Sequence, residues 1–311
     1  MKIVFLGTPD FAVPSLRALH EAGHEIVGAF CQPDRPRGRN MRLCACAVKC
    51  AAEELGIPVI QVESIRKQEG LDALRALKPD LCVTAAFGQI LSAKNLAVPP
   101  LGTVNVHASL LPKYRGAAPI QAAIIAGERK TGVTTMYTDI GVDTGDMILQ
   151  REIEIGEDET AGELFERLAQ LGARAIVKTV ALIEKGIAPR VPQDESLASH
   201  CKMIRKEDAF IDFTKSAREV NNLIRGMNPW PIAYALADEQ PLKIYSAQVV
   251  ERSGLPGELL CKSPRDGLVI ACGEGAISAE IFQIPGGRPM QAHEYLCGHT
   301  IKSRFLGGRN G

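Results

Sequence analysis

The first half of the chain alternates short β-rich runs with helical patterns, and this alternation limits the possible folds more than any other feature. The β-rich runs are KIVFLG at 2–7, EIVGAFC at 25–31, PVIQV at 58–62, LCVTAAF at 81–87 and TVNVHAS at 103–109. Helical patterns such as PSLRALHEAG separate them. Because parallel strands are joined by long crossovers, usually helices, this order predicts an α/β domain with a doubly wound, mostly parallel sheet.

The turn after the first run, GTPDF at 7–11, argues against one common use of such a sheet. It lacks the G-x-G-x-x-G spacing that lets a dinucleotide pyrophosphate approach a helix N-terminus. A dinucleotide-dependent dehydrogenase is therefore disfavoured.

A change of character near residue 190 indicates two domains, which a chain of 311 residues leads one to expect. Thr160 and Glu163 form a capping-box pattern before a long helical pattern. The polar, proline-bearing stretch APRVPQDESLASHCK follows and is typical of a linker. The sequence predicts a first domain at 1–189, a linker at 190–206 and a second domain at 207–311.

The second domain shows one helical pattern followed by short strand patterns. A capping box at Ser216 and Glu219 precedes the helix. The strand patterns lie at 242–250, 257–263, 267–273 and 276–283, and turn residues separate them. This spacing predicts a small antiparallel barrel or sandwich.

The charge balance, 36 basic against 36 acidic residues, gives no global signature of nucleic-acid binding, so a polyanion would need a local basic patch. One candidate lies between Asp34 and Glu53, a stretch without acidic residues. Its basic residues are Arg35, Arg37, Arg39, Arg42 and Lys49. A cationic loop of this kind suits phosphate contacts, and the plain alternative is a solvated surface loop.

The cysteines and the N-terminus indicate a compartment. Nine scattered cysteines do not suggest a disulfide framework, and the CACAVKC cluster at 44–50 lacks the second ligand pair of a zinc site. The apolar run at the start of MKIVFLGTPD is too short for a signal-peptide core or a membrane span. A soluble, cytoplasmic protein with reduced thiols is expected.

A polar pair in the last β-rich run of the first half is the strongest candidate for chemistry. Asn105 and His107 are two residues apart, so in a strand they point to the same face. Asp143, in a turn rich in Gly and Asp, could bring a carboxylate to them. With no Ser or Cys nucleophile beside them, these groups suggest direct transfer between two bound substrates. Asn105 could stabilise an oxyanion, His107 could stabilise that charge or supply a proton, and Asp143 could orient the imidazole.

Each of these residues also has a plain structural interpretation. A single His on an apolar strand is usually a satisfied core or surface residue. An Asp in a DTGD turn often caps its own backbone, and Asn105 could satisfy a backbone group at a strand end. Pattern alone leaves both interpretations open.

At these residues the sequence resembles the formyltransferases that use 10-formyltetrahydrofolate. The resemblance rests on Asn105, His107, SLLPKYRG at 109–116 and GVTTMYTDIGVDTGDMI at 132–148. Further matching segments are FLGTPDFAVPSL, QPDRPRGR, AAFGQIL and NPWP, so the resemblance spans nearly the whole chain. It is closest to those members of the family that act on methionyl-tRNA.

The resemblance implies a fold, a reaction and a site. The fold would be a Rossmann-like formyltransferase domain followed by an OB-like antiparallel barrel that binds tRNA. Asn105, His107 and Asp143 would be catalytic, with 10-formyltetrahydrofolate as cosubstrate and no metal. The acceptor would be the α-amino group of methionine on initiator methionyl-tRNA, formylated for translation initiation, and a monomer is expected. The implied folate-binding residues are Phe87, Gly88, Gln89, Ile90, Leu91, Ser109, Leu110, Leu111, Pro112 and Ile140.

The resemblance also implies a role for the arginine-rich segment, because an insertion at this place in the tRNA-specific members holds the acceptor stem. Arg35, Arg37, Arg39 and Arg42 are the implied tRNA-binding residues. Their segment differs from the lysine-rich, Ser-Pro-containing version expected in the family.

Three other functions remain open. A related formyltransferase would act on a sugar amine or a purine-pathway amine with the same three residues. A formyltetrahydrofolate hydrolase would use water as the acceptor. A nucleotide- or RNA-binding module without catalytic activity would bind RNA whether or not His107 is present.

Overall fold

A computed structural model describes residues 1–37, 42–237, 239–304 and 306. The chain divides into two compact units. The first comprises 1–119, 130–154 and 165–201, and the second comprises 120–129, 155–164 and 202–311. Each unit contains several separate segments of the chain, so this division does not test the boundaries predicted at 189 and 206. They stay predictions.

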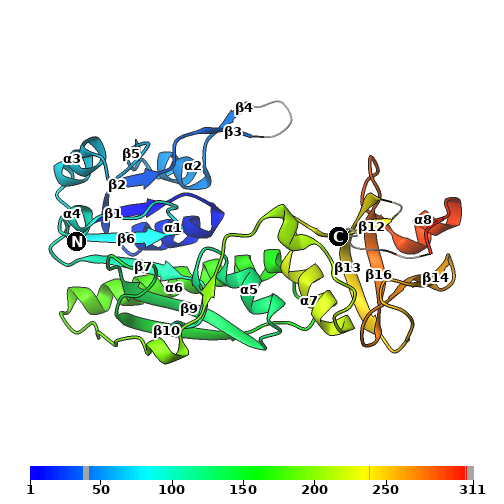
Figure 1. Ribbon diagram of the computed structural model, residues 1–311. Helices are drawn as coiled ribbons and strands as arrows, with labels where there is room; N and C mark the ends of the chain where they lie inside the picture. The colour runs from blue at the N-terminus through cyan, green and yellow to red at the C-terminus, as the bar shows by residue number, and fades with distance from the viewer. Residues whose placement is uncertain (38–41, 238, 305, 307–311) are drawn as a thin grey trace. The chain divides into compact units, whose positions relative to one another are not determined.

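The first unit is built on a seven-stranded sheet of order β10-β9-β7-β6-β1-β2-β5 (Figure 1). Its strands are β1 (Lys2–Gly7), β2 (Glu25–Cys31), β5 (Val59–Gln61), β6 (Leu81–Ala85), β7 (Thr103–His107), β9 (Lys130–Tyr137) and β10 (Met147–Glu154). Its α-helices are α1 (Val13–Glu21), α2 (Ala47–Glu54), α3 (Gln68–Ala76), α4 (Ala93–Leu96) and most of α6 (Ala161–Glu184). Two small two-stranded sheets pair β3 (Arg35–Arg37) with β4 (Arg42–Cys44), and β8 (Arg115–Gly116) with β11 (His200–Cys201). Short 3₁₀ turns cover Asp10–Ala12 and Glu195–Leu197.

The central strands are buried on both faces, which explains their almost continuous apolar runs. In β1, Val4 and Leu6 belong to a core cluster that also contains Leu74 of α3. Ile3 and Phe5 alternate with them, point to the opposite face and are fully buried. Strands β5, β2, β1, β6 and β7 pair in parallel, so the predicted mostly parallel α/β sheet is confirmed.

The edge of the sheet beyond β7 is antiparallel. Strand β9 pairs antiparallel with both β7 and β10, and a turn at 138–146 joins β9 to β10. Helix α6 covers this region, since a Cβ on its Gly172 would lie 2.8 Å from Val106 of β7. The capping box before α6 is present as predicted, with Glu163 N donating to Thr160 Oγ1 at 3.3 Å and Thr160 N to Glu163 Oε2 at 2.9 Å.

The second unit contains an antiparallel sheet, as predicted, packed against helices. Its elements include α5 (Pro119–Ile125), 3₁₀ turn Lys206–Ala209, α7 (Ala217–Gly226), β12 (Ala233–Ala237), β13 (Gln240–Val250), β14 (Leu259–Ser263), β15 (Gly267–Ala271), β16 (Ala276–Gln283), β17 (Met290–Gln291) and α8 (Ala292–Gly298). The sheet order is β12-β13-β16-β15-β14, and β17 also pairs with β16. Its core joins Val220 and Ile224 of α7 to Ile244, Ile270 and Phe282 of the sheet. The capping box of Ser216 and Glu219 before α7 is also present.

Two general features bear on function. Within the described residues, no helix has both the length and the apolar character that a membrane span needs. The same residues contain no cluster of three or more His, Cys, Asp or Glu side chains suited to a metal ion.

Candidate functional site

Strand β7 presents Asn105 and His107 on one face, between β6 and β9. Asn105 lies opposite Thr84 of β6, and the Thr84 hydroxyl is 2.8 Å from Asn105 Oδ1. In the structure the oxygen edge of the amide faces Thr84, and the NH₂ group lies on the other edge. Among the residues that the structure describes, this NH₂ group meets no acceptor. Both hydrogens of the Asn105 NH₂ group are thus unused within the described residues.

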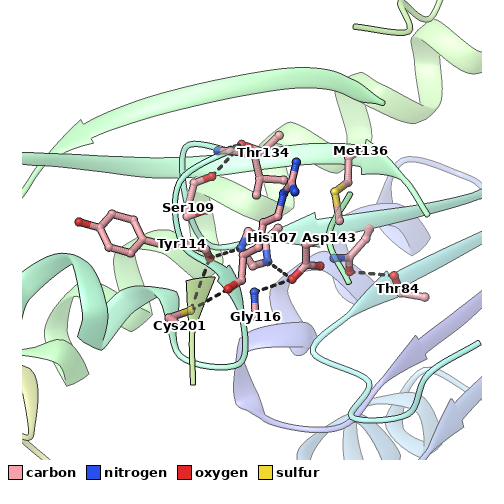
Figure 2. Close-up of polar contacts among 12 residues, drawn as sticks. Thr84, His107, Ser109, Tyr114, Gly116, Thr134, Met136, Asp143 and Cys201 are labelled. Atoms are coloured by element: carbon pink, nitrogen blue, oxygen red, sulfur yellow. Dashed lines mark hydrogen bonds and ion pairs between the residues drawn. The ribbon is translucent and has the colours of Figure 1, made fainter. Parts of the chain in front are cut away.

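The His107 imidazole is held between two groups (Figure 2). Its Nε2 lies 2.9 Å from the Tyr114 carbonyl oxygen, which can only accept, so Nε2 carries a hydrogen. Its Nδ1 lies 3.6 Å from Asp143 Oδ2, an ion-pair distance that is too long for a hydrogen bond. The His107 side chain is 6% exposed and that of Asp143 is 15% exposed. In this sheltered position, a positive charge on the ring would directly face the carboxylate.

Asp143 reaches His107 through an unusual path of the chain. Strand β9 is antiparallel to β7 and ends beside the start of β7, where Thr138 N donates to Thr103 O at 2.8 Å. The turn at 138–146 nevertheless brings Asp143 to the His107 end of β7. Asp143 adopts a left-handed φ of 55°, and its Oδ2 accepts the Gly116 N–H at 2.8 Å. A non-glycine residue with positive φ is uncommon and must be held by its surroundings.

The loop after β7 is fixed by hydrogen bonds to its neighbours. Thr134 of β9 donates from Oγ1 to Ser109 O at 2.7 Å and accepts from Leu111 N at 3.1 Å. The Ser109 hydroxyl donates to Lys113 O at 2.7 Å. Tyr114 has a left-handed φ of 60°, and its carbonyl accepts from His107 Nε2. The predicted irregular loop is thus a defined support for the imidazole.

The segment after α6, expected to be a linker, packs on this loop in the first unit. Ser199 Oγ accepts from Tyr114 N at 2.9 Å, and Ser199 O accepts from Arg115 N at 2.8 Å. The Cys201 thiol donates to Tyr114 O at 3.5 Å, and Cys201 O accepts from Ala117 N at 3.2 Å. Burial raises the pKa of the Cys201 thiol, so it remains a protonated donor. We call residues 190–201 the strap.

A buried arginine joins the loop to the strap. Arg115 is 1% exposed and makes a two-pronged pair with the Glu195 carboxylate, at 2.9 and 2.8 Å. Its Nε donates to Gln193 Oε1 at 3.0 Å. The neighbouring Glu195 carboxylate raises the pKa of Arg115, and the guanidinium in turn lowers the pKa of Glu195. The pair therefore joins the loop after β7 to the strap through a charge-assisted, two-pronged contact in which each charge compensates the other.

The residues expected to bind folate come from three segments. From the segment after β6, Phe87 and Leu91 are buried, Gly88 has a φ of 80°, and Gln89 is bound to the backbone of Val62 and Ile65. Ile90 and Ile140 are 61% and 79% exposed. From the loop after β7, Ser109 and Leu111 are buried, while Leu110 and Pro112 are partly buried. Within this set, Ile90 and Ile140 are thus the residues that offer large exposed apolar surfaces.

Three of the four expected tRNA-binding arginines, Arg35, Arg37 and Arg42, lie in the strands of a hairpin. Strands β3 and β4 pair antiparallel, with Arg37 opposite Arg42, and stand away from the main sheet in Figure 1. Arg35 is exposed, and Arg39 lies outside the described residues. Lys49 belongs to the same basic stretch, but its Nζ lies 2.6 Å from Asp34 Oδ2. Its charge is therefore compensated at the base of the hairpin.

Four supporting residues were not anticipated from the sequence. Thr84 orients Asn105, the Tyr114 carbonyl and Gly116 N–H hold His107 and Asp143, and Gln193 contacts the turn that carries Asp143. The PKYRG turn signalled an irregular backbone near Tyr114 and Gly116. No local pattern marks Gln193, because its partners are 48 or more residues away in the sequence.

The two family models that match cover most of the chain. One, described as formyl transferase, matches residues 1–180, and the other, formyl transferase C-terminal domain, matches residues 203–300. A methionyl-tRNA formyltransferase of Citrifermentans bemidjiense is 44% identical over 309 residues, which cover 99% of this chain and 97% of the relative. One from Acetivibrio thermocellus is 46% identical over 304 residues, 97% of each chain.

Solved structures with low sequence identity share the fold. The N-formyltransferase from Helicobacter canadensis, in complex with folinic acid and dTDP-3-aminofucose, has a TM-score of 0.65 at 20% identity and covers 90% of this chain and 99% of that one. HypX from Aquifex aeolicus, in complex with tetrahydrofolic acid, has a TM-score of 0.63 at 17% identity over 95% of this chain. The chain spans 47% of HypX, about half of that protein.

Proposed function

The chain belongs to the formyl transferase family, and from this premise we propose that it moves the formyl group of 10-formyltetrahydrofolate to the α-amino group of methionine on initiator methionyl-tRNA. The product is N-formylmethionyl-tRNA for translation initiation. One observation of the site carries the proposal: His107 Nδ1 lies 3.6 Å from Asp143 Oδ2, and Asn105, on the same strand as His107, has an NH₂ group that meets no acceptor among the described residues. Relatives of 44% and 46% identity over nearly the whole chain support the acceptor.

The proposed roles of the three catalytic residues follow from the bonds that change. A C–N bond forms between the amine and the formyl carbon, and the bond from that carbon to the folate nitrogen breaks. The Asn105 amide donates to the formyl oxygen as that oxygen gains negative charge. The His107–Asp143 pair carries a proton between the attacking amine and the departing nitrogen. No nucleophile from the protein is needed, because the substrate supplies the amine.

Two exposed apolar side chains suit the proposed folate site. Ile90 and Ile140 leave more than half of their surfaces open to solvent. A flat pterin ring could cover such side chains and remove apolar surface from water. Backbone groups of Phe87 to Leu91 and Ser109 to Pro112, with the turn at Ile140, complete the proposed folate-binding set.

The hairpin of β3 and β4 is the proposed contact for tRNA phosphates, with Arg35, Arg37, Arg39 and Arg42 as its cations. Four arginines within eight residues give this segment a local positive charge, although the net charge of the whole chain is zero. The second domain, proposed at 207–311, is expected to contribute an RNA-binding face. A cytoplasmic monomer fits this reaction and remains part of the proposal.

Replacing Arg39 and Arg42 by Ala is expected to raise KM for tRNA and to reduce its salt dependence. Each phosphate that is no longer neutralised lowers the slope of log affinity against log salt by about 0.7 to 0.9, so the double substitution should lower it by up to about 1.8. A matched control replaces the exposed Arg66 and Lys67, which removes the same charge elsewhere on the first unit. Initial rates between about 50 and 200 mM salt measure the slope. An unchanged slope would show that the hairpin does not contact phosphates.

The proposed reaction is tested by incubating the protein with 10-formyltetrahydrofolate and methionyl-tRNA, and then assaying the blocked amine. Formylmethionyl-tRNA is the expected product, with far slower transfer to amino sugars or to a purine-pathway amine. Folate turnover without an acceptor would indicate a hydrolase. RNA binding that ignores both the aminoacyl group and His107→Ala would indicate a binding module instead.

A further inference from the structure

The strap contacts the turn that carries Asp143 through the Gln193 amide and through an ion pair of Arg190 with Asp146. Gln193 Nε2 donates to the carbonyl of Asp143 at 2.8 Å and to the carbonyl of Gly145 at 2.9 Å. The same nitrogen lies 3.9 Å from Met136 Sδ. The two hydrogens of one NH₂ group therefore bridge the two carbonyls on either side of Thr144.

The orientation of this amide is fixed from the other side. Gln193 Oε1 accepts from Arg115 Nε at 3.0 Å, and Arg115 is anchored by Glu195. A flipped amide would place its NH₂ group against the guanidinium N–H and its oxygen against two carbonyls. Only the observed orientation pairs every donor with an acceptor.

Arg115 links Gln193 back to the catalytic pair through its two neighbours in the chain. The carbonyl of Tyr114, before it, accepts from His107 Nε2, and the N–H of Gly116, after it, donates to Asp143 Oδ2. The contacts thus close a ring from His107 through Asp143, Gln193 and Arg115 to the Tyr114 carbonyl and back to His107. Gln193 is the member of this ring that reaches it from the strap and touches the Asp143 turn directly.

We propose that Gln193 is a positioning residue, whose amide holds the 138–146 turn and thereby sets the position of the Asp143 carboxylate against His107. The turn needs such support, because Asp143 has a φ of 55°. The turn is also tightly packed at Gly145, where an added Cβ would lie 1.8 Å from Tyr137 O. Without the amide, two carbonyls of a strained turn lose their donor, and the carboxylate moves away from the ring. The inference rests on the proposed function, in which Asp143 acts through His107.

Two substitutions of Gln193 distinguish its contact with the turn from its contact with Arg115. Gln193→Ala removes the acceptor of Arg115 Nε, whereas Gln193→Glu supplies a charged one, so they disturb Arg115 in opposite directions. Both remove the NH₂ group that holds the turn. Each is expected to lower kcat by about 10- to 100-fold, the range that a misplacement of about 1 Å can cost. Ser196→Ala is the matched strap control, since Ser196 is exposed and bonds to its near neighbour Asp194, and it should keep normal kcat.

The decisive test repeats both Gln193 substitutions in an Asp143→Asn background, in single-turnover reactions with enzyme in excess. If Gln193 acts through the Asp143 carboxylate, the same substitutions change the rate by less than about twofold there, because interacting residues are not additive. A general loss of folding would instead lower both backgrounds by the same factor. That equal factor, or an unchanged kcat in either single variant, would overturn the inference. If methionyl-tRNA is not formylated at all, the proposed function fails, and the same ratios are then measured on whichever acceptor turns over.

Discussion

Replacing Asp143 by Asn is expected to lower kcat for formyl transfer by about 100- to 10,000-fold, the usual contribution of general acid–base catalysis. The substitution keeps the size of the side chain, and its Oδ1 can still accept the Gly116 N–H. Asn also tolerates the φ of 55° found at this position. The charge that faces His107 is therefore the only large change. Steady-state rates with methionyl-tRNA measure the effect.

A second aspartate in the same turn gives a matched control for this result. Asp146 pairs with Arg190 at 3.6 Å instead of with His107. Asp146→Asn should therefore retain near-normal kcat, while His107→Ala should lose as much as Asp143→Asn. Circular dichroism checks that all three variants remain folded. Near-normal kcat in the Asp143 or His107 variant would remove the catalytic assignment.

Replacing Gly116 by Ala is expected to lower the free energy of unfolding by about 2 to 5 kcal/mol and to abolish most activity. Gly116 has a φ of 115°, where side chains are strained, and an added Cβ would lie 2.3 Å from Cys201 O. Relief of this clash must separate β8 from β11 and move the N–H group that binds Asp143. Stability and catalysis should therefore fall together. Urea titration and the formylation rate measure the two effects.

Gly186→Ala separates the clash from the backbone strain. Gly186 follows α6 with a φ of 66°, and an added Cβ there would meet no atom of the described residues within 4 Å. This variant should lose only the conformational preference of glycine, about 1 kcal/mol, and remain active. If Gly116→Ala is no less stable than Gly186→Ala, the strap does not constrain the backbone of β8.

Much of the fold could be predicted from local patterns. The alternation of runs such as KIVFLG with helical segments led to the parallel sheet, because burial on both faces requires continuous apolar strands. The capping boxes at Thr160 and Ser216 marked the starts of two helices, because these hydrogen bonds form within four residues. The hairpin of β3 and β4 was not predicted, since its residues carry no apolar alternation.

Some residues of the candidate site could also be predicted from local patterns, and others could not. Strand periodicity put Asn105 and His107 on one face, since that relation needs only two neighbouring peptide units. The turn pattern suggested Asp143 but was equally consistent with a plain turn former, and only the family resemblance favoured its place in the site. Gln193 was passed over as part of a polar linker. A hydrogen bond to a carbonyl 50 residues earlier leaves no mark in the local sequence.

The sequence by itself determined the strands of the main sheet, the shared face of Asn105 and His107 and the family, because these depend on residue types at short spacing. Only the tertiary structure decided how Asp143 reaches His107 from the far end of an antiparallel strand. It alone also showed that the strap contacts Tyr114 through Ser199 and Cys201 and the Asp143 turn through Gln193. Such contacts join residues that are dozens of positions apart, and their geometry follows from packing of the whole unit rather than from any local preference.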